Sequence, residues 1–282
     1  MSRAVMYERF GGPEVLELRD VPEPHAGPGE IRIRVAAVGL NAMDPAFVAM
    51  PELAARFGIT LPSGFGYDLA GSVDEVGDGV EGFTVGERVY GGVMERAAAD
   101  FVVIAGGTAA AVLAALNLGP ADTVLVGGAA GGVGVFVVQL ARLAGATVIG
   151  TASQPTFPFL RDLGAEPVAY GAGLQNRVRA SAPSGITAAI DLFGTETIET
   201  ALALGLAPAR IVAIAAGPNP PGGARAVSGS HAAPDAVPQI AAAIAAHKLI
   251  MPIAARLPIE QIREAAALQA DRHVHGKIVV TL

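Results

Sequence analysis

The chain of 282 residues contains no cysteine. Disulfide bonds, a cysteine nucleophile and a zinc site built from thiolates are therefore excluded. A chain without cysteine suits a reducing cytosol, and we expect a cytoplasmic protein. Tryptophan is also absent, and aromatic residues make up only 5% of the chain. The sequence therefore offers no aromatic stacking platform that would define a substrate.

Charge is scarce as well, with 16% charged residues and a formal net charge of −7. No basic stripe or block of like charges occurs, so nucleic acid is a poor candidate partner. The N-terminal stretch MSRAVMYERF has no apolar core, and we expect no signal peptide. Residues 101–121 carry no charge, which is long enough for a membrane span. Their glycines, with Asn117 and Pro120, instead favour a buried strand followed by a core helix.

The chain divides into regions of different rhythm. Residues 1–104 are predicted to form short strands, such as EIRIRVAAV (30–38), in which isoleucine and valine alternate with arginine. Residues 105–249 alternate apolar strands with helices, which predicts a parallel sheet covered on both faces. Residues 250–282 hold one more helix, 259–269, and a final strand, GKIVVTL. The strands expected in the middle region are 123–126, 147–151, 189–192 and 210–215, and its helices are 133–144, 157–163, 197–204 and 236–247.

A glycine-rich turn, GAAGGVG (128–134), lies between the first of these strands and the first helix. This context is typical of a dinucleotide-binding loop, in which Gly131 would admit a pyrophosphate and Gly134 would let the helix pack closely. Ala129 occupies the first glycine position of the G-x-G-x-x-G pattern. We predict a negative φ there, because a Cβ at positive φ would cost about 1–2 kcal/mol. The alternative is a tight turn that binds nothing.

The acidic residue expected after the second strand is missing, since no Asp or Glu occurs between Gly134 and Asp162. In loops that prefer NAD, this carboxylate holds the ribose 2′-hydroxyl and would repel a 2′-phosphate. Here the strand ends in GTASQPTF, which is uncharged and rich in hydroxyl groups. Arg161 lies one helical turn beyond Phe157, either near the phosphate or as a solvated helix charge. We therefore predict NADP(H) over NAD(H).

Four segments in order carry a resemblance to a known family. They are residues 10–44 (FGGPEVLELRDVPEPHAGPGEIRIRVAAVGLNAMD), residues 66–91 (GYDLAGSVDEVGDGVEGFTVGERVYG), GAAGGVG and HGKIVV (275–280). The chain resembles, nearly end to end, the zinc-free quinone oxidoreductases of the medium-chain dehydrogenase/reductase superfamily, the zeta-crystallin-like branch. In that branch alanine is the expected residue at the position of Ala129.

The resemblance implies an α/β protein with a GroES-like β-barrel catalytic domain, 1–104 with 250–282, and a Rossmann domain, 105–249. NADPH would lie in the cleft between them. Asn41 matches an asparagine that lines the nicotinamide and substrate pocket. The residues that the resemblance assigns to the cofactor are Thr108, Ala130, Gly131, Gly132, Val133, Gly134, Ser153, Tyr170, Ala215, Ala216, Gly217 and Lys277.

Reduction of a conjugated carbonyl also needs a proton, and Tyr67, Asp44 and water are the candidate donors. Tyr67 is favoured because it is expected near the cleft, with a place in the barrel wall as the alternative. Asp68 is expected to anchor the local turn. Zinc-dependent relatives have a His-Glu pair where this chain has Tyr67 and Asp68, so we expect no metal. His273 and His275 could ligate a metal, but a solvent-facing chain end explains them better.

Three departures from the family stand out. Gln154 follows Ser153, where a Lys or Arg often holds the 2′-phosphate. The segment PAFVAMPELAA after Asp44 lacks the usual basic or aromatic residue. A connection that contains proline and a short helix is missing between Ile104 and Ala105, where it would form part of the hinge between the domains.

These observations predict an NADPH-dependent enzyme that reduces a quinone or another conjugated carbonyl by metal-free hydride transfer. An enoyl-thioester reductase is an alternative, although no basic cluster for a phosphopantetheine or CoA arm is present. The short junction motivates another alternative, a protein that binds NADPH without turnover. No G-x-S-x-G elbow supports hydrolysis. The resemblance also implies a homodimer, because members of the family commonly dimerise by extending the Rossmann sheet across an edge strand. ARAVSGSH (224–231) is the matching candidate, and a bare strand edge needs covering.

Overall fold

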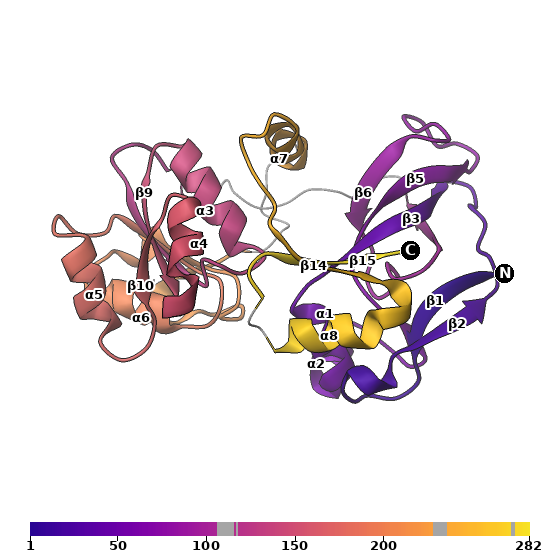
Figure 1. The fold of residues 1–282 in the computed structure, drawn as a ribbon, viewed down its shortest axis with the longest axis horizontal. Helices are drawn as coiled ribbons and strands as arrows, with labels where there is room; N and C mark the ends of the chain where they lie inside the picture. Colours follow the sequence, from indigo (N-terminus) through magenta and orange to yellow (C-terminus); the bar gives the residue numbers. More distant parts are fainter. Residues whose placement is uncertain (106–115, 117, 228–235, 272–273) are drawn as a thin grey trace. The chain divides into compact units, whose positions relative to one another are not determined.

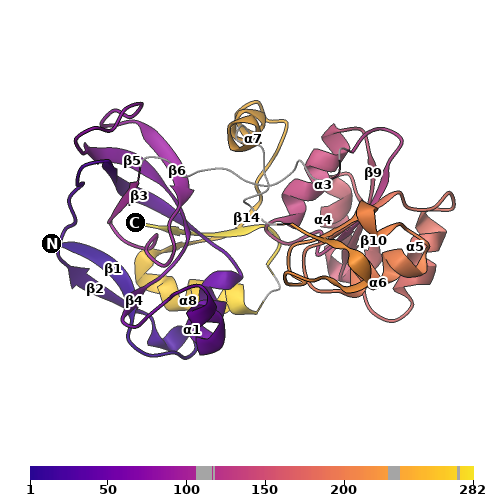
Figure 2. The same ribbon diagram turned by 180° about the vertical axis from the view of Figure 1, so that it is seen from behind.

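The computed structural model describes residues 1–105, 116, 118–227, 236–271 and 274–282. Two compact units make up the chain. Unit 1 comprises Met1–Ala109 and Ile253–Leu282, and unit 2 comprises Ala110–Pro252. Figures 1 and 2 show the elements of each unit.

Unit 1 is built on two sheets. A sheet in the order β2-β1-β4 is antiparallel throughout. A larger sheet has the order β14-β15-β3-β5-β6, and β7 pairs with β3 beside this path. The strands are β1 (Ser2–Tyr7), β2 (Glu17–Val21), β3 (Glu30–Leu40), β4 (Ser63–Gly64), β5 (Asp68–Val76), β6 (Arg88–Gly92), β7 (Phe101–Ala105), β14 (Ile253–Pro258) and β15 (Lys277–Thr281). This unit has the β-rich, GroES-like character that the sequence predicts.

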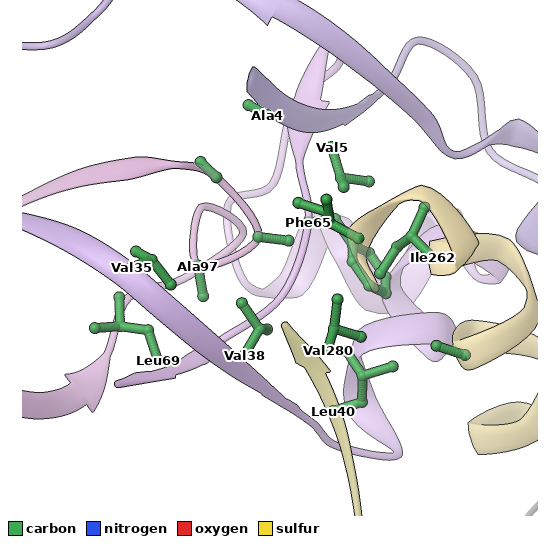
Figure 3. Packing of buried hydrophobic residues seen from close by; sticks show 14 of the residues in the cluster. Ala4, Val5, Val35, Val38, Leu40, Phe65, Leu69, Ala97, Ile262 and Val280 are labelled. Atoms are coloured by element: carbon green, nitrogen blue, oxygen red, sulfur yellow. The ribbon is translucent and has the colours of Figure 1, made fainter. Parts of the chain in front are cut away.

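The long strand β3 organises the core of unit 1, as its alternating sequence predicts. Its alternating residues Ile31, Ile33 and Val35 are buried. After a register irregularity between Val35 and Ala37, Val38 and Leu40 face the same core and are buried with Phe65, Ile262 and Val280 (Figure 3). The arginines of β3 lie on the opposite face, where both guanidinium groups stack on the ring of Phe101. The helices of this unit are α1 (Met43–Ala49), α2 (Pro51–Arg56) and α8 (Ile262–Ala270).

Unit 2 contains a six-stranded sheet in the order β10-β9-β8-β11-β12-β13. Every pair in it is parallel. Counted along the chain, the order is 3-2-1-4-5-6, the doubly wound arrangement of a Rossmann domain. The strands are β8 (Thr123–Gly127), β9 (Thr147–Ala152), β10 (Glu166–Ala169), β11 (Ala188–Asp191), β12 (Ile211–Ala213) and β13 (Arg225–Ala226).

Apolar residues cover both faces of this sheet. Val124 and Val126 of β8 share one buried cluster with residues of α3 and α4. Leu125, between them, belongs to a second cluster with residues of α5 and α6. The sequence prediction of strands that are apolar on both faces is confirmed. The helices of this unit are α3 (Gly134–Leu143), α4 (Phe157–Asp162), α5 (Leu174–Ser181), α6 (Glu196–Ala203) and α7 (Ala236–Ala245).

Some elements differ from the sequence prediction. Strand β14 was not predicted, because IAARLP is mostly exposed at a sheet edge and shows no apolar alternation. Strand β12 ends at Ala213, two residues before the predicted end. The helix predicted from Ile259 begins as a 3-10 turn, and α8 starts at Ile262. In residues 101–121, the expected strand is β7, and most of the expected helix lies outside the described residues. No helix in the described ranges is long and apolar enough to cross a membrane.

Candidate functional site

The glycine-rich turn leaves β8 through a left-handed residue. Gly128 has φ +69°, whereas Ala129 is not among the residues with positive φ. The predicted negative φ at Ala129 is therefore confirmed, and Gly128 takes the conformation that a side chain would oppose. Ala129 is fully buried. A Cβ placed on Gly150 of β9 would lie 2.9 Å from the Ala129 methyl group, which occupies that space.

Two further glycines of the turn have different requirements. A Cβ on Gly134 would lie 2.2 Å from the carbonyl oxygen of Gly128, so only glycine lets α3 begin this close to the strand. A Cβ on Gly131 would meet no atom nearer than 3.4 Å, which leaves its outer side open. Among the described residues, the N–H groups of Gly132, Val133 and Gly134 have no hydrogen-bond acceptor. Free donors at a helix N-terminus fit a pyrophosphate.

The loops after β8 and β11 lie side by side, because these strands are neighbours in the sheet. The N–H of Leu192 donates to the Gly127 carbonyl at 3.2 Å. The buried Asp191 carboxylate accepts the N–H groups of Phe193 at 2.9 Å, Gly194 at 2.7 Å and Thr197 at 3.1 Å, which fixes the second loop. The strand order reverses at this point, and parallel sheets bind ligands there. Sequence reasoning missed Asp191, although it is the last residue of the apolar strand β11.

The end of β9 is uncharged, as the sequence predicts. Ser153 and Thr156 join their hydroxyl groups at 2.8 Å. Thr151 accepts the N–H of Gly128 at 3.2 Å and so ties β9 to the glycine turn. Arg161 places its guanidinium 5.8 Å from the centroid of the Phe157 ring on its own helix. These contacts link the hydroxyl-rich strand end to the turn that would hold a pyrophosphate.

Tyr170 follows β10 and is 57% exposed. The guanidinium of Arg177 holds its loop by donating to four carbonyl groups, those of Ala169, Tyr170, Gly171 and Ala172. Beyond β12, Ala215 and Ala216 lead to Gly217, which has φ +78°. All these loops leave the carboxyl ends of parallel strands, so they lie along one edge of the sheet.

A separate polar cluster lies in unit 1. The Lys277 ammonium donates to Asn41 Oδ1 at 2.6 Å and to Asp68 Oδ2 at 2.8 Å. The Asn41 amide donates to Asp68 Oδ2 at 3.1 Å, and its backbone N–H donates to Asp44 Oδ2 at 2.6 Å. The structure thus brings together three predicted site residues, Asn41, Asp44 and Lys277. Asp68, expected to anchor a turn, instead pairs with the lysine.

Asp44 is completely buried, and its Oδ1 has no partner in the described part of the chain. Burial raises the pKa of Asp44 to about 7, although the Asn41 N–H and the Lys277 charge oppose this shift. Glu95 is also buried, and its Oε2 accepts the hydroxyl of Tyr7 at 2.9 Å. Burial likewise raises the pKa of Glu95 to about 7; the Tyr7 hydrogen bond opposes this rise and the charge of Asp44 adds to it. Sequence reasoning gave no signal for Glu95.

Two protein-family models match overlapping parts of the chain. The model of the alcohol dehydrogenase GroES-like domain matches residues 27–139, and the model of zinc-binding dehydrogenases matches residues 132–232. The chain belongs to the medium-chain dehydrogenase/reductase superfamily. Its curated relatives include the quinone oxidoreductase of Pseudomonas aeruginosa, 35% identical over 183 residues. That alignment covers 55% of this chain and 54% of the relative, so the chain spans about half the length of this relative.

Solved structures of superfamily members have the same fold. The quinone oxidoreductase from Coxiella burnetii is 26% identical, with a TM-score of 0.85 over 100% of this chain and 99% of its own. A mycobacterial protein solved as a complex with NADPH is 24% identical, with a TM-score of 0.85 and full coverage of both chains. The GroES-like unit and the Rossmann sheet predicted from the sequence are therefore both confirmed.

The remaining positions predicted from the sequence are Tyr67, Thr108, the possible metal ligands and the Ile104–Ala105 junction. Tyr67 is 39% exposed, and its ring packs where a Cβ on Gly92 would stand, 2.3 Å from Tyr67 Cε1. In the described ranges, no group of three or more His, Cys, Asp or Glu residues could hold a metal ion. Thr108 and His273 lie outside the described residues. The Ile104–Ala105 junction lies within β7, where Ala105 still pairs with Glu30 of β3.

Proposed function

We propose that the protein is an NADPH-dependent oxidoreductase that reduces a quinone or another conjugated carbonyl without a metal ion. The observation that carries this proposal is the glycine turn after β8. It combines an open Gly131 with three N–H groups that have no acceptor in the described part of the chain, beside the point where the strand order reverses. Membership of the superfamily and the likeness to quinone oxidoreductases support the reaction type.

The cofactor is assigned to the loops of unit 2. Ala130 and the turn residues Gly131, Gly132, Val133 and Gly134 would hold the pyrophosphate through backbone N–H groups. Ser153 and Tyr170 would flank the 2′-phosphate. Ala215, Ala216 and Gly217 would lie beside the nicotinamide, and Thr108 would lie near the cofactor. The uncharged end of β9 supports NADPH over NADH, because no carboxylate repels the extra phosphate.

The bound cofactor would supply the hydride, and the side chains of unit 1 would position the acceptor and deliver a proton. Asn41 is proposed beside the acceptor, with its backbone held by Asp44. Because Asp44 is fully buried, the proton donor we favour is the hydroxyl of Tyr67. The domain boundaries after residues 104 and 249, the cytoplasmic location and the homodimer stay predictions.

Cofactor and acceptor binding can be tested in sequence on the purified protein. NADPH and NADH are titrated by cofactor fluorescence, and 1,4-benzoquinone, 9,10-phenanthrenequinone and crotonyl-CoA are then added while nicotinamide absorbance is followed. We expect tighter binding of NADPH and its oxidation by at least one quinone. If the protein binds neither cofactor, the proposal is refuted. If crotonyl-CoA is the only acceptor that oxidises NADPH, the protein is an enoyl reductase.

A second candidate is a protein that binds NADPH without turnover. It is motivated by the short junction at Ile104–Ala105, where β7 continues without a break. NADPH binding with no oxidation by any acceptor would favour this candidate.

A further inference from the structure

The chain has only two lysines, Lys248 and Lys277. Lys277 forms a closed ring of hydrogen bonds with Asn41 and Asp68. The ammonium donates to Asn41 Oδ1 at 2.6 Å and to Asp68 Oδ2 at 2.8 Å, and Asn41 Nδ2 donates to Asp68 Oδ2 at 3.1 Å. We call these three side chains the amide lock. Each member bonds to the other two, and two of the three bonds involve the lysine.

The register of strands β3, β5 and β15 brings the three residues of the amide lock close together. Gly39 of β3 lies opposite Asp68 of β5, and Leu40 lies opposite Ile278, the residue after Lys277. The lysine reaches across β3 over Gly39, where an added Cβ would lie 2.8 Å from Lys277 Cε. Gly39 does not have a positive φ. A side chain at this position would therefore displace the lysine from its path over β3.

The charges of the lock determine which way the Asn41 amide points. A lysine ammonium can only donate hydrogen bonds and a carboxylate can only accept them. A reversed amide would place its NH₂ group against Lys277 and its oxygen against Asp68, so both charge-assisted bonds would be lost. Within the described ranges, the second hydrogen of Nδ2 has only the Gly39 carbonyl at 3.5 Å, which is a long contact. This hydrogen is the one left for an acceptor oxygen.

We propose that Lys277 and Asp68 are positioning residues that fix the Asn41 amide, and that Lys277 does not bind the cofactor. The proposal rests on the proposed function, in which Asn41 lies beside the acceptor. The backbone of Asn41 is held separately, since its N–H donates to Asp44 and its carbonyl accepts the Asp44 N–H at 3.1 Å. Removal of Lys277 should therefore release the side chain of Asn41 and leave its main chain in place.

A double-mutant cycle tests this role in the full-length protein. Lys277→Met and Asn41→Ala should each lower kcat/KM for the quinone about tenfold, and the double variant should lose no more than the larger single loss. The Kd for NADPH should stay within about twofold. Lys277→Arg should recover part of the activity, and Lys248→Met, which removes the other lysine, should match the wild type. Losses that multiply, or a tenfold weaker NADPH affinity, would overturn the proposal.

A second readout does not depend on turnover. The Asn41 side-chain amide is assigned in ¹⁵N-labelled protein by its loss in Asn41→Ala. In Lys277→Met and Gly39→Ala, its two protons should shift and exchange faster with solvent, while Lys248→Met leaves them unchanged. Unchanged amide protons in Lys277→Met would overturn the proposal, even if the wild type reduces none of the acceptors and the proposed function fails. If Lys277→Met does not fold, Asp68→Asn replaces it in both experiments with the same expected results.

Discussion

Asp44 and Glu95 are carboxyl groups that unit 1 removes almost completely from water. Each has one oxygen without a partner in the described part of the chain, Asp44 Oδ1 and Glu95 Oε1. The ionised forms would leave these oxygens as buried, unpaired charge, so burial raises both pKa values to about 7. The same burial, with the Glu95 charge, raises the pKa of Tyr7. These three groups therefore bind their protons more tightly in the folded protein than in the unfolded chain.

The stability of the protein should depend on these protons. Because the folded pKa of Asp44 is higher than its ordinary value of 3.8, its stabilising contribution is complete below about pH 4 and is lost as pH rises through about 7. We expect the free energy of unfolding to fall by about 2–4 kcal/mol per group across this range. Asp44→Asn should flatten the fall when urea unfolding is measured at several pH values.

Asp78→Asn provides the matched control, because it removes a carboxyl group of the same unit that is exposed and not buried. The free energy of unfolding of Asp78→Asn should depend on pH in the same way as that of the wild type. A profile for Asp44→Asn as steep as that of the wild type would contradict a role of Asp44 in this dependence.

At the scale of elements, two glycines of the turn between β8 and α3 have different roles. Gly134 is needed for packing, and Gly131 is proposed to leave room for the cofactor. Gly134→Ala should destabilise the protein by about 1–3 kcal/mol, because its Cβ would lie 2.2 Å from the Gly128 carbonyl oxygen. Gly131→Ala has open space and should change stability by less than about 1 kcal/mol. It should nevertheless weaken NADPH binding about tenfold, since the methyl group would keep a phosphate from the turn. Denaturant unfolding and fluorescence titration of both variants measure these effects, and equal NADPH affinity in Gly131→Ala and the wild type would argue against pyrophosphate binding here.

The turn from β9 into α4 should control the choice between the two cofactors. Gln154 is exposed and directly follows Ser153. Gln154→Arg adds a cation and should lower the Kd for NADPH about tenfold, with little change for NADH, because only NADPH carries the 2′-phosphate. Gln154→Met serves as the uncharged control. Parallel fluorescence titrations with both cofactors measure the ratio, and an equal gain for NADH would place the phosphate elsewhere.

Local sequence signals predict some elements much better than others. The strand, glycine turn and helix at residues 123–144 were predicted correctly because apolar periodicity and glycine spacing lie within a short window. The amide lock could not be derived in this way, since Lys277 lies 209 residues from Asp68 and 236 from Asn41. The resemblance named Asn41 and Lys277, but only strand register shows that they touch. Strand β14 was missed because an exposed edge strand leaves no apolar pattern.

For the whole molecule, the proposed homodimer depends on β13, the last strand of the unit 2 sheet among the described strands. Val227 donates its N–H to Ala213 of β12 at 2.8 Å, so the N–H of the preceding residue, Ala226, points away from β12. Ala226→Pro would remove this outer donor and spare the bond to β12. We expect a dimer for the wild type and for Ala226→Ser but a monomer for Ala226→Pro in size-exclusion chromatography with light scattering. A wild-type monomer, or a dimeric proline variant, would exclude pairing through β13.

The place of β15 in its sheet has a consequence for synthesis on the ribosome. This strand lies between β14 and β3, although it is near the end of the chain and β3 is near the beginning. Unit 2 is one continuous segment, so its whole sheet has been translated when the last 30 residues of unit 1, Ile253–Leu282, are still to come. At 5–20 residues per second, translating them takes roughly 2–6 s. During that interval β7 already pairs with Glu30–Arg34 of β3, but the end of β3 from Ala37 to Leu40 still lacks the partner that β15 will supply. Nascent unit 1 is therefore the part of this protein that a chaperone should bind.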